Sequence, residues 1–342
     1  MDVYIAELDS DVPLNVQLEA ALDWLGWNKI IDPGATVFLK PNLTWSQPIP
    51  GVTTSPAFIE AVVSVMRTRT SNIIVGEADG GYHSFDAEEA FESHGLYDIT
   101  KRYDVQVVNL SDLPSEEANT IINGKRVTLE LPSLLLHGVD VFITLPVPKV
   151  HVMTRVSLAF KNQWGCIPET MRLRHHPQFA EKVIAINKLL KPSIAIFDGT
   201  YFLDRTGPMI GDPVRMNLLV AANDIGAGSL ACCRIMNIDP WKVKHFTLAR
   251  QERMFSNSLD EVVLNQPIEP FCHHQFRVER TLINWIALAG FNSDILTRLL
   301  YDSAFADPIH RILYTVRKNR LIGQLLYGEI GPPAAGGART QS

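Results

Sequence analysis

The chain has 342 residues, of which 46% are apolar, and a formal net charge of −6. Because this length exceeds what one hydrophobic core usually serves, we expect one large α/β unit with a smaller appendage, or two domains. The acidic balance argues against nucleic-acid and anionic-membrane binding, since no overall basic field is present, so any anion has to be held locally.

The first two thirds of the chain alternate between strand-like and helix-like patterns. We expect strands at residues 3–7, 36–40, 72–76, 105–110, 139–145 and 193–197, and helices at 15–25, 56–66, 86–94 and 178–190. The expected helix at 86–94 is short. The expected helix at 56–66 begins with Ser55-Pro56, a capping residue followed by proline at the first helical position. This alternation predicts an α/β fold, a mostly parallel sheet with helices on both faces.

The remaining segments interrupt or follow this alternation. Asn123-Gly124 lies between two alternating runs in 119–131, which predicts an inserted hairpin. After residue 224 the pattern turns helical, and it stays so from about residue 275. We therefore expect an α/β domain at 1–250, a mostly helical appendage at 251–330, and a disordered Gly-, Pro- and Ala-rich tail at 331–342.

Cysteines and apolar runs indicate the compartment. The four cysteines are scattered and form no C-x-x-C pair, which favours a reducing environment. Asp2 stands where a secretory signal would carry Lys or Arg, and no long apolar run follows. The apolar stretch 281–301 is broken by Asn292, Asp294 and Arg298, so it is not expected to span a membrane. We expect a cytoplasmic protein with no membrane partner.

Polar side chains follow four of the predicted strands where each strand ends. Because the carboxyl ends of parallel strands meet at one edge of a sheet, these side chains should converge. The expected site residues are Lys40, Asn42, Thr54, Glu77, Lys149, His151, Lys161, Asn162 and Asp198. Taken singly, each is equally well explained as a helix cap or a surface group.

The chemistry of this set suits a small anion that carries a carboxylate or phosphate. Lys40, Lys149 and Lys161 would supply charge, Asn42 and Asn162 would orient the ligand, and Thr54 would offer a hydroxyl at a helix N-terminus.

His151 is the expected general acid or base, with Glu77 or Asp198 as the partner that orients it. The alternative is a nucleotide- or metabolite-binding module without turnover. A carboxylate within hydrogen-bond reach of His151 would favour catalysis. A cleft that holds only lysines and amides, with His151 packed in the core, would favour binding.

Known cofactor and nucleophile motifs do not identify the class of reaction. Neither Gly-x-Gly-x-x-Gly, a P-loop nor Gly-x-Ser-x-Gly occurs in the chain. Possible ligands for a divalent metal are Glu77, Asp79, His83, His151, Asp198 and Asp224. They show no ligand spacing within one segment, so the sequence leaves a metal open. The pairs His175-His176 and His273-His274 are expected to be surface or core groups.

Six short motifs in order across residues 36–250 resemble the domain-of-unknown-function family 362. They are Leu39-Lys40-Pro41-Asn42-Leu43, Thr53-Thr54-Ser55-Pro56, Val75-Gly76-Glu77, Pro148-Lys149-Val150-His151, Lys161-Asn162-Gln163-Trp164-Gly165 and Asp198-Gly199. Many members of that family carry a ferredoxin-like segment with C-x-x-C-x-x-C clusters. This chain lacks the segment, so we do not expect an iron–sulfur cluster.

A second similarity joins His151 to Lys161. The spacing His-x9-Lys, with Ser157 between them and Gly165 after, is similar to a segment of nickel-pincer lactate racemases. In those enzymes the lysine anchors a nickel-pincer nucleotide and histidines move the substrate hydroxyl proton. This resemblance implies a third alternative, a metal- or pincer-cofactor-dependent redox or racemase enzyme. The chain departs from that family at Phe160 and lacks its Asp-His-x-x-Arg stretch.

The C-terminal third carries apolar side chains suited to a lid or a homodimer contact. They include Trp285, Phe291, Leu299 and Leu300. An ordinary packed subdomain explains them equally simply.

Overall fold

The computed structural model describes residues 1–81, 84–301, 303 and 308. By their contacts the residues form two compact units, the first Met1–Glu279 and the second beginning at Arg280. Residues 251–279 group with the first unit by their contacts, and the expected domain boundary at residue 250 stays a prediction. The expected tail, 331–342, lies outside the described residues.

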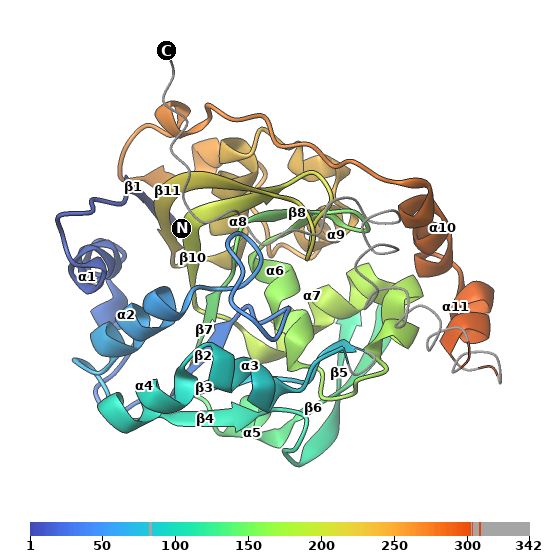
Figure 1. Ribbon diagram of the computed structural model, residues 1–342, viewed down its shortest axis with the longest axis horizontal. Helices are drawn as coiled ribbons and strands as arrows, with labels where there is room; N and C mark the ends of the chain where they lie inside the picture. Colours follow the sequence, from blue (N-terminus) through green and yellow to red (C-terminus); the bar gives the residue numbers. More distant parts are fainter. Residues whose placement is uncertain (82–83, 302, 304–307, 309–342) are drawn as a thin grey trace. The chain divides into compact units, whose positions relative to one another are not determined.

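The first unit is built around a mixed sheet whose parallel half was predicted (Figure 1). The strand order is β12-β1-β11-β10-β7-β2-β3-β4, and β10, β7, β2, β3 and β4 run parallel. The bounds are β1 Asp2–Glu7, β2 Val37–Pro41, β3 Ile73–Glu77, β4 Gln106–Asn109, β7 Val141–Leu145, β10 Ile194–Asp204, β11 Asp212–Ala222 and β12 Val263–Leu264. Every residue of β2, β3 and β7 is buried, as expected for central parallel strands covered on both faces.

Helices cover the sheet in two groups (Figure 1). In one group α1 (Leu14–Trp24) packs against α2 (Pro56–Met66), and α2 packs against α4 (Leu96–Tyr103). In the other, α6 (Ala159–Asn162) contacts α7 (Phe179–Leu190) and α8 (Ile225–Ile235), and α7 contacts α9 (Lys244–Gln251). The remaining short helices of this unit are α3 Ala87–Ser93, α5 Ser133–His137 and the 3-10 turns η1 Trp27–Lys29, η3 Gln163–Cys166, η4 Arg172–Gln178, η5 Pro240–Lys242, η6 Leu259–Glu261 and η7 Glu269–Phe271. The predicted α/β architecture is confirmed.

The inserted hairpin is also confirmed. β5 (Ser115–Ile122) and β6 (Lys125–Pro132) pair antiparallel as a separate two-stranded sheet. Asn123 and Gly124 have φ angles of 47° and 73°, the left-handed backbone that a tight hairpin turn requires.

The sheet contains strands that the sequence pattern did not predict. β11 runs antiparallel between β1 and β10, which makes the sheet mixed. After β7 the chain forms a small antiparallel pair, β8 (Lys149–His151) and β9 (Arg155–Ser157), and β8 pairs with the end of β10. These strands bring the segment 146–166 back over the end of the sheet.

The second unit contains two described helices, α10 (Leu282–Phe291) and α11 (Asp294–Tyr301). They contact each other, and the Thr297 hydroxyl donates to the Gly290 carbonyl at 2.9 Å. Among the described helices, none combines the length and apolarity needed to cross a membrane.

Candidate functional site

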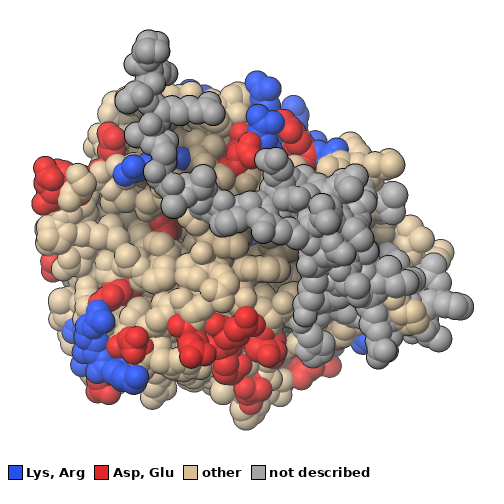
Figure 2. All heavy atoms as spheres, viewed as in Figure 1, with Lys and Arg blue, Asp and Glu red and all other residues tan. Residues whose placement is uncertain are grey.

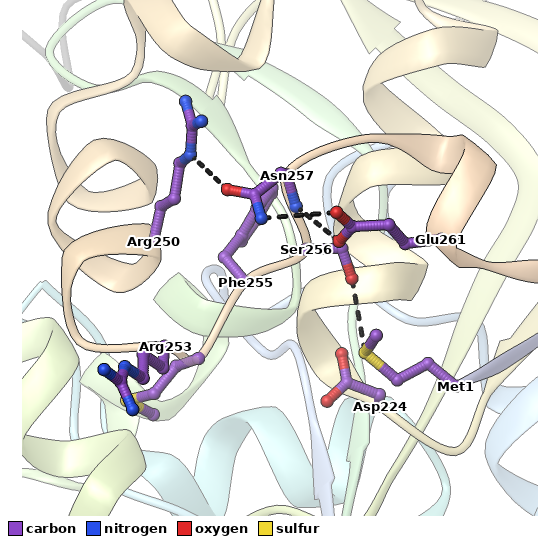
Figure 3. Close-up of a pocket in the computed structure, with 9 residues that line it drawn as sticks. Met1, Asp224, Arg250, Arg253, Phe255, Ser256, Asn257 and Glu261 are labelled. Atoms are coloured by element: carbon purple, nitrogen blue, oxygen red, sulfur yellow. Dashed lines mark hydrogen bonds between the residues drawn. The ribbon is translucent and has the colours of Figure 1, made fainter.

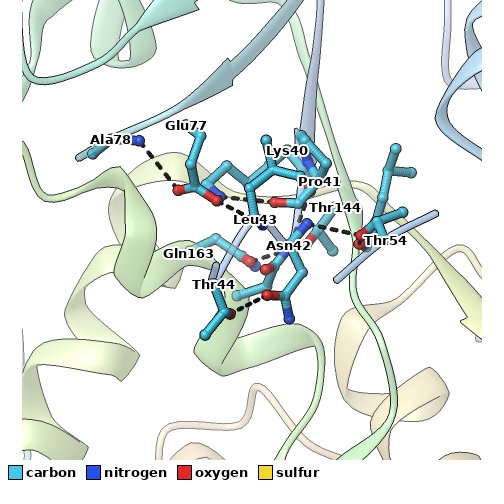
Figure 4. A network of polar contacts seen from close by, with 12 residues as sticks. Lys40, Pro41, Asn42, Leu43, Thr44, Thr54, Glu77, Ala78, Thr144 and Gln163 are labelled. Carbon is cyan, nitrogen blue, oxygen red and sulfur yellow. Dashed lines mark hydrogen bonds and ion pairs between the residues drawn. The ribbon is translucent and has the colours of Figure 1, made fainter. Parts of the chain in front are cut away.

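A buried ion pair joins the ends of two neighbouring strands, β2 and β3 (Figure 4). Lys40 Nζ lies 2.6 Å from Glu77 Oε2 and donates to the Pro41 carbonyl at 2.8 Å. The Glu77 carboxylate also accepts from the backbone amides of Leu43 and Ala78, at 3.1 Å each. Both side chains are buried and bonded to protein groups, so the pair forms part of the scaffold.

Gly165 allows the 3-10 turn η3 to rest directly on this ion pair. A Cβ atom at Gly165 would lie 2.3 Å from Glu77 Oε1 and 3.1 Å from Lys40 Nζ. The Gly165 carbonyl accepts from the Ala78 amide at 3.2 Å. A residue without a side chain is therefore required here by the close approach.

A chain of buried amides continues from the ion pair into the helices. Asn162 Nδ2 donates to the Lys40 carbonyl and to Thr144 Oγ1, both at 2.9 Å. The Thr144 hydroxyl donates to Gln163 Oε1 at 3.0 Å, and Gln163 Nε2 donates to Asn187 Oδ1 at 2.8 Å. Asn162 was expected to orient a ligand, but in this structure its amide hydrogens serve the scaffold.

Lys149, Asn42 and Thr54 anchor the loop that follows β2. The Thr54 hydroxyl donates to the Leu145 carbonyl at 2.7 Å and accepts from the backbone N–H of Asn42 at 2.8 Å. Lys149 Nζ donates to the Val52 carbonyl at 2.6 Å and lies 3.4 Å from Asn42 Oδ1. Burial lowers the pKa of Lys149 well below its ordinary value. These three predicted site residues are brought together, with their polar atoms bonded to the loop and the sheet.

Asp198 holds the start of α2. Its Oδ2 accepts from the Ser55 amide at 2.8 Å and its Oδ1 from the Thr200 amide at 3.2 Å. Ser55 occupies the N-cap position, but its own side chain makes no capping hydrogen bond. A carboxylate at this position satisfies a free amide and interacts favourably with the helix dipole.

His151 is held by backbone amides and not by the predicted carboxylates. Its Nδ1 accepts from the amides of Met153 and Thr154 at 3.1 and 3.4 Å. Among the hydrogen bonds of the described residues, none joins His151 to Glu77 or Asp198. Burial first, and then the charge of Lys161, lower the pKa of His151 well below its ordinary value. The ring is therefore neutral, with its proton on Nε2.

Around Lys161 the structure gathers groups that the sequence did not connect. Lys161 Nζ lies 6.0 Å from the centroid of the Phe179 ring. That ring lies 6.2 Å from the rings of both His176 and His245. The charge of Lys161 acts on three histidines, so they share its surroundings. We define the Lys161 centre as Lys161, His151, His176, Phe179 and His245.

At neutral pH the Lys161 centre holds one cation among uncharged rings. Burial, together with the nearby charge of Arg172, lowers the pKa of Lys161 to about 8. Burial and the Lys161 charge lower the pKa of both His176 and His245 to about 3. The histidines are neutral donors or acceptors there, and Lys161 supplies the positive charge.

Two side-chain groups of this centre lack a partner among the described residues. There the Lys161 ammonium forms no hydrogen bond or ion pair, and its recorded contact is with the Phe179 ring. The Nε2 atom of His245 is buried without a hydrogen-bond partner, and His245 is 1% exposed. Buried polar atoms are nearly always paired, so His245 Nε2 is available to a ligand. The half-buried Lys161 ammonium lies close enough to act on the same ligand.

The sequence missed His176 and His245. His176 was expected to be a surface or core group, and His245 belongs to α9, far from the strand ends along the chain. No local spacing links these residues to Lys161, since they meet only through the packing of η4, α7 and α9.

A separate pocket lies elsewhere in the first unit (Figure 3). It has a volume of about 200 Å³ and is lined by Met1, Asp224, Arg250, Arg253, Met254, Phe255, Ser256, Asn257 and Glu261. Arg250 Nε donates to Asn257 Oδ1 at 2.7 Å, and Asn257 in turn donates to Glu261. None of the predicted site residues lines this pocket.

The candidate metal ligands are not brought together. In the described parts of the chain, no group of three or more His, Cys, Asp and Glu side chains is arranged to hold a metal ion. Asp79 accepts from the Ala87 amide, and Asp224 caps α8 through the Ala227 amide. His83 lies outside the described residues.

Comparisons with known proteins agree with the motif resemblance. The thylakoid-associated protein sll1697 of Synechocystis sp. is 27% identical over 240 residues, which cover 68% of this chain and 72% of that protein. The lactate racemase apoprotein of Thermoanaerobacterium thermosaccharolyticum aligns with a TM-score of 0.43 and 13% identity. That alignment covers 69% of this chain and 57% of the racemase. This structural similarity is too weak to support any argument about activity. The family described as domain of unknown function DUF362 matches residues 37–234, more than half of the chain. The chain therefore belongs to the DUF362 family.

Proposed function

We propose that the chain binds a small anionic metabolite, carrying a carboxylate or a phosphate, at the Lys161 centre. The observation that carries this proposal is the Lys161 ammonium, whose pKa is lowered by burial and which has no counter-charge among the described residues. A cation held in a protein interior is stabilised by an opposite charge. A bound anion would supply that charge.

The neighbouring histidines support the same ligand class. His151 has its proton on Nε2, because two backbone amides occupy Nδ1. A neutral imidazole in this tautomer donates a hydrogen bond to an anionic or carbonyl oxygen. The unpartnered Nε2 of His245 is a second group that such a ligand would satisfy.

Binding is favoured over acid–base catalysis by the surroundings of His151. A general base has to accept a proton at a free ring nitrogen. On His151 that proton would have to go to Nδ1, against two amide N–H groups. Glu77 and Asp198, the expected partners, are engaged with other groups. We therefore assign His151 the role of a hydrogen-bond donor, and Lys40, Glu77 and Asn162 the role of scaffold.

The test is isothermal titration of the full chain with inorganic phosphate and, separately, with malonate. Hydrogen bonds to charged groups contribute about 1.5–3 kcal/mol, so Lys161→Met should weaken binding by about 10- to 100-fold. The matched control is Lys125→Met, which removes the same charge from the exposed hairpin. His151→Phe should weaken binding while leaving the pH dependence in place.

The pH dependence has a defined sign. Since the ligand needs a protonated Lys161, whose pKa is about 8, affinity should fall as the pH rises through that value. Unchanged affinity of Lys161→Met for both probes, or no binding by the unaltered chain, would reject the proposal. Turnover of a screened metabolite that is lost in His151→Phe would replace binding with catalysis.

A further inference from the structure

Apolar side chains are exposed on the second unit of the chain. On α10, Leu282 is 76% exposed and Trp285 is 56% exposed. These two residues are separated by three positions, so they lie on the same side of the helix. On α11, Ile295 is 81% exposed. We call these three side chains the α10–α11 apolar face.

The composition of α10 is unusual for a helix in water. Its sequence, Leu282 to Phe291, contains no charged residue. A helix without a charged face is normally covered, either by protein or by lipid. The described contacts of α10 with α11 leave these three side chains exposed, so the apolar face is open to a binding partner.

The two units differ in the sign of their net charge. Residues 280–342 contain seven Lys and Arg but four Asp and Glu, a net charge of +3, so the −6 of the whole chain leaves −9 on residues 1–279. Figure 2 shows acidic side chains gathered over α3 in the first unit, where Glu88 and Glu89 occupy the first turn. The overall acidity of the chain therefore does not describe the second unit.

We propose that the α10–α11 apolar face binds the surface of an anionic lipid membrane. Leu, Ile and Trp side chains enter the boundary between headgroups and acyl chains, and Trp is favoured at that depth. Arg280, whose guanidinium lies 5.3 Å from the Trp285 ring, and Arg298, exposed on α11, add positive charge beside the face. A second copy of the chain would bring like charges together, whereas anionic lipid headgroups complement them.

The experiment is co-sedimentation of the full chain with two kinds of vesicle, phosphatidylcholine alone and phosphatidylcholine mixed with phosphatidylglycerol. The chain should partition at least about tenfold more strongly onto the anionic vesicles. The variant with Leu282→Ser, Trp285→Ser and Ile295→Ser should lose about tenfold or more of that partitioning. Arg298→Glu should weaken binding to the anionic vesicles.

The matched control carries Val16→Ser, Trp24→Ser and Ile121→Ser, three exposed apolar residues of the first unit. It should bind vesicles as the unaltered chain does. Equal loss in both triple variants, or no preference for anionic vesicles, would overturn the proposal. A dimer in light scattering that becomes monomeric only in the α10–α11 variant, without vesicle binding, would assign the face to a second copy instead.

Discussion

Replacing Lys40 by methionine tests whether the buried ion pair is scaffold. Lys40 is fully buried, and its ammonium lies 2.6 Å from Glu77 Oε2. Methionine has a similar length but no charge, so the Glu77 carboxylate would be left buried without its cation. Breaking a buried pair in this way costs about 3–5 kcal/mol, and we expect that loss in the free energy of unfolding. Urea unfolding followed by circular dichroism at pH 7 measures it.

A second variant separates charge from packing. In the double variant Lys40→Met, Glu77→Gln, the side chain at 77 carries no charge. Its single carbonyl oxygen can accept from either the Leu43 or the Ala78 backbone amide, because these two amides donate to different carboxylate oxygens of Glu77. The double variant should therefore regain part of the stability lost by Lys40→Met alone, because it removes the buried charge but keeps only one of the two amide hydrogen bonds. Lys125→Met is the control, because an exposed lysine contributes little to stability. A loss below about 1 kcal/mol in Lys40→Met, or a double variant no more stable than the single one, would refute the scaffold assignment.

Three further outcomes follow from the same geometry. Gly165→Ala places a Cβ atom against Glu77 Oε1, so it should lower the free energy of unfolding by about 1–3 kcal/mol, and an unchanged melting temperature would contradict the close approach. Asp198→Ala removes a charged acceptor from the amide at the start of α2 and should cost about 1.5–3 kcal/mol, whereas a neutral result would show that the helix start does not depend on the carboxylate. The pKa of His245 is about 3 in the folded chain and about 6.5 unfolded, so the stability it contributes is present above pH 6.5 and is lost as the pH falls. Between pH 6.5 and 5 this histidine should lower the free energy of unfolding by up to about 2 kcal/mol. In denaturant titrations His245→Phe should reduce the slope of the stability profile by that share, while the contributions of His151 and His176 remain.

Much of the fold could be predicted because its signals are local. The continuous apolar runs of β2, β3 and β7 indicate buried parallel strands, and Asn123-Gly124 specifies a hairpin turn. The family could be predicted for the same reason, since its motifs are short and contiguous. β11 could not, because a strand's neighbours and direction depend on pairing across the sheet and not on its own pattern. The cytoplasmic location stays a prediction.

The candidate site was likewise only partly predictable from the sequence. The sequence by itself determined that Lys40, Asn42, Glu77 and Lys149 follow strands of one sheet, and they do meet in a connected region. Only the tertiary structure decided that Lys40 and Glu77 pair with each other, whereas Lys161 has no counter-charge among the described residues. It also decided that His245 lies near Lys161. The physical reason is that charge and hydrogen bonding depend on distance in space, which the order of residues along the chain does not specify.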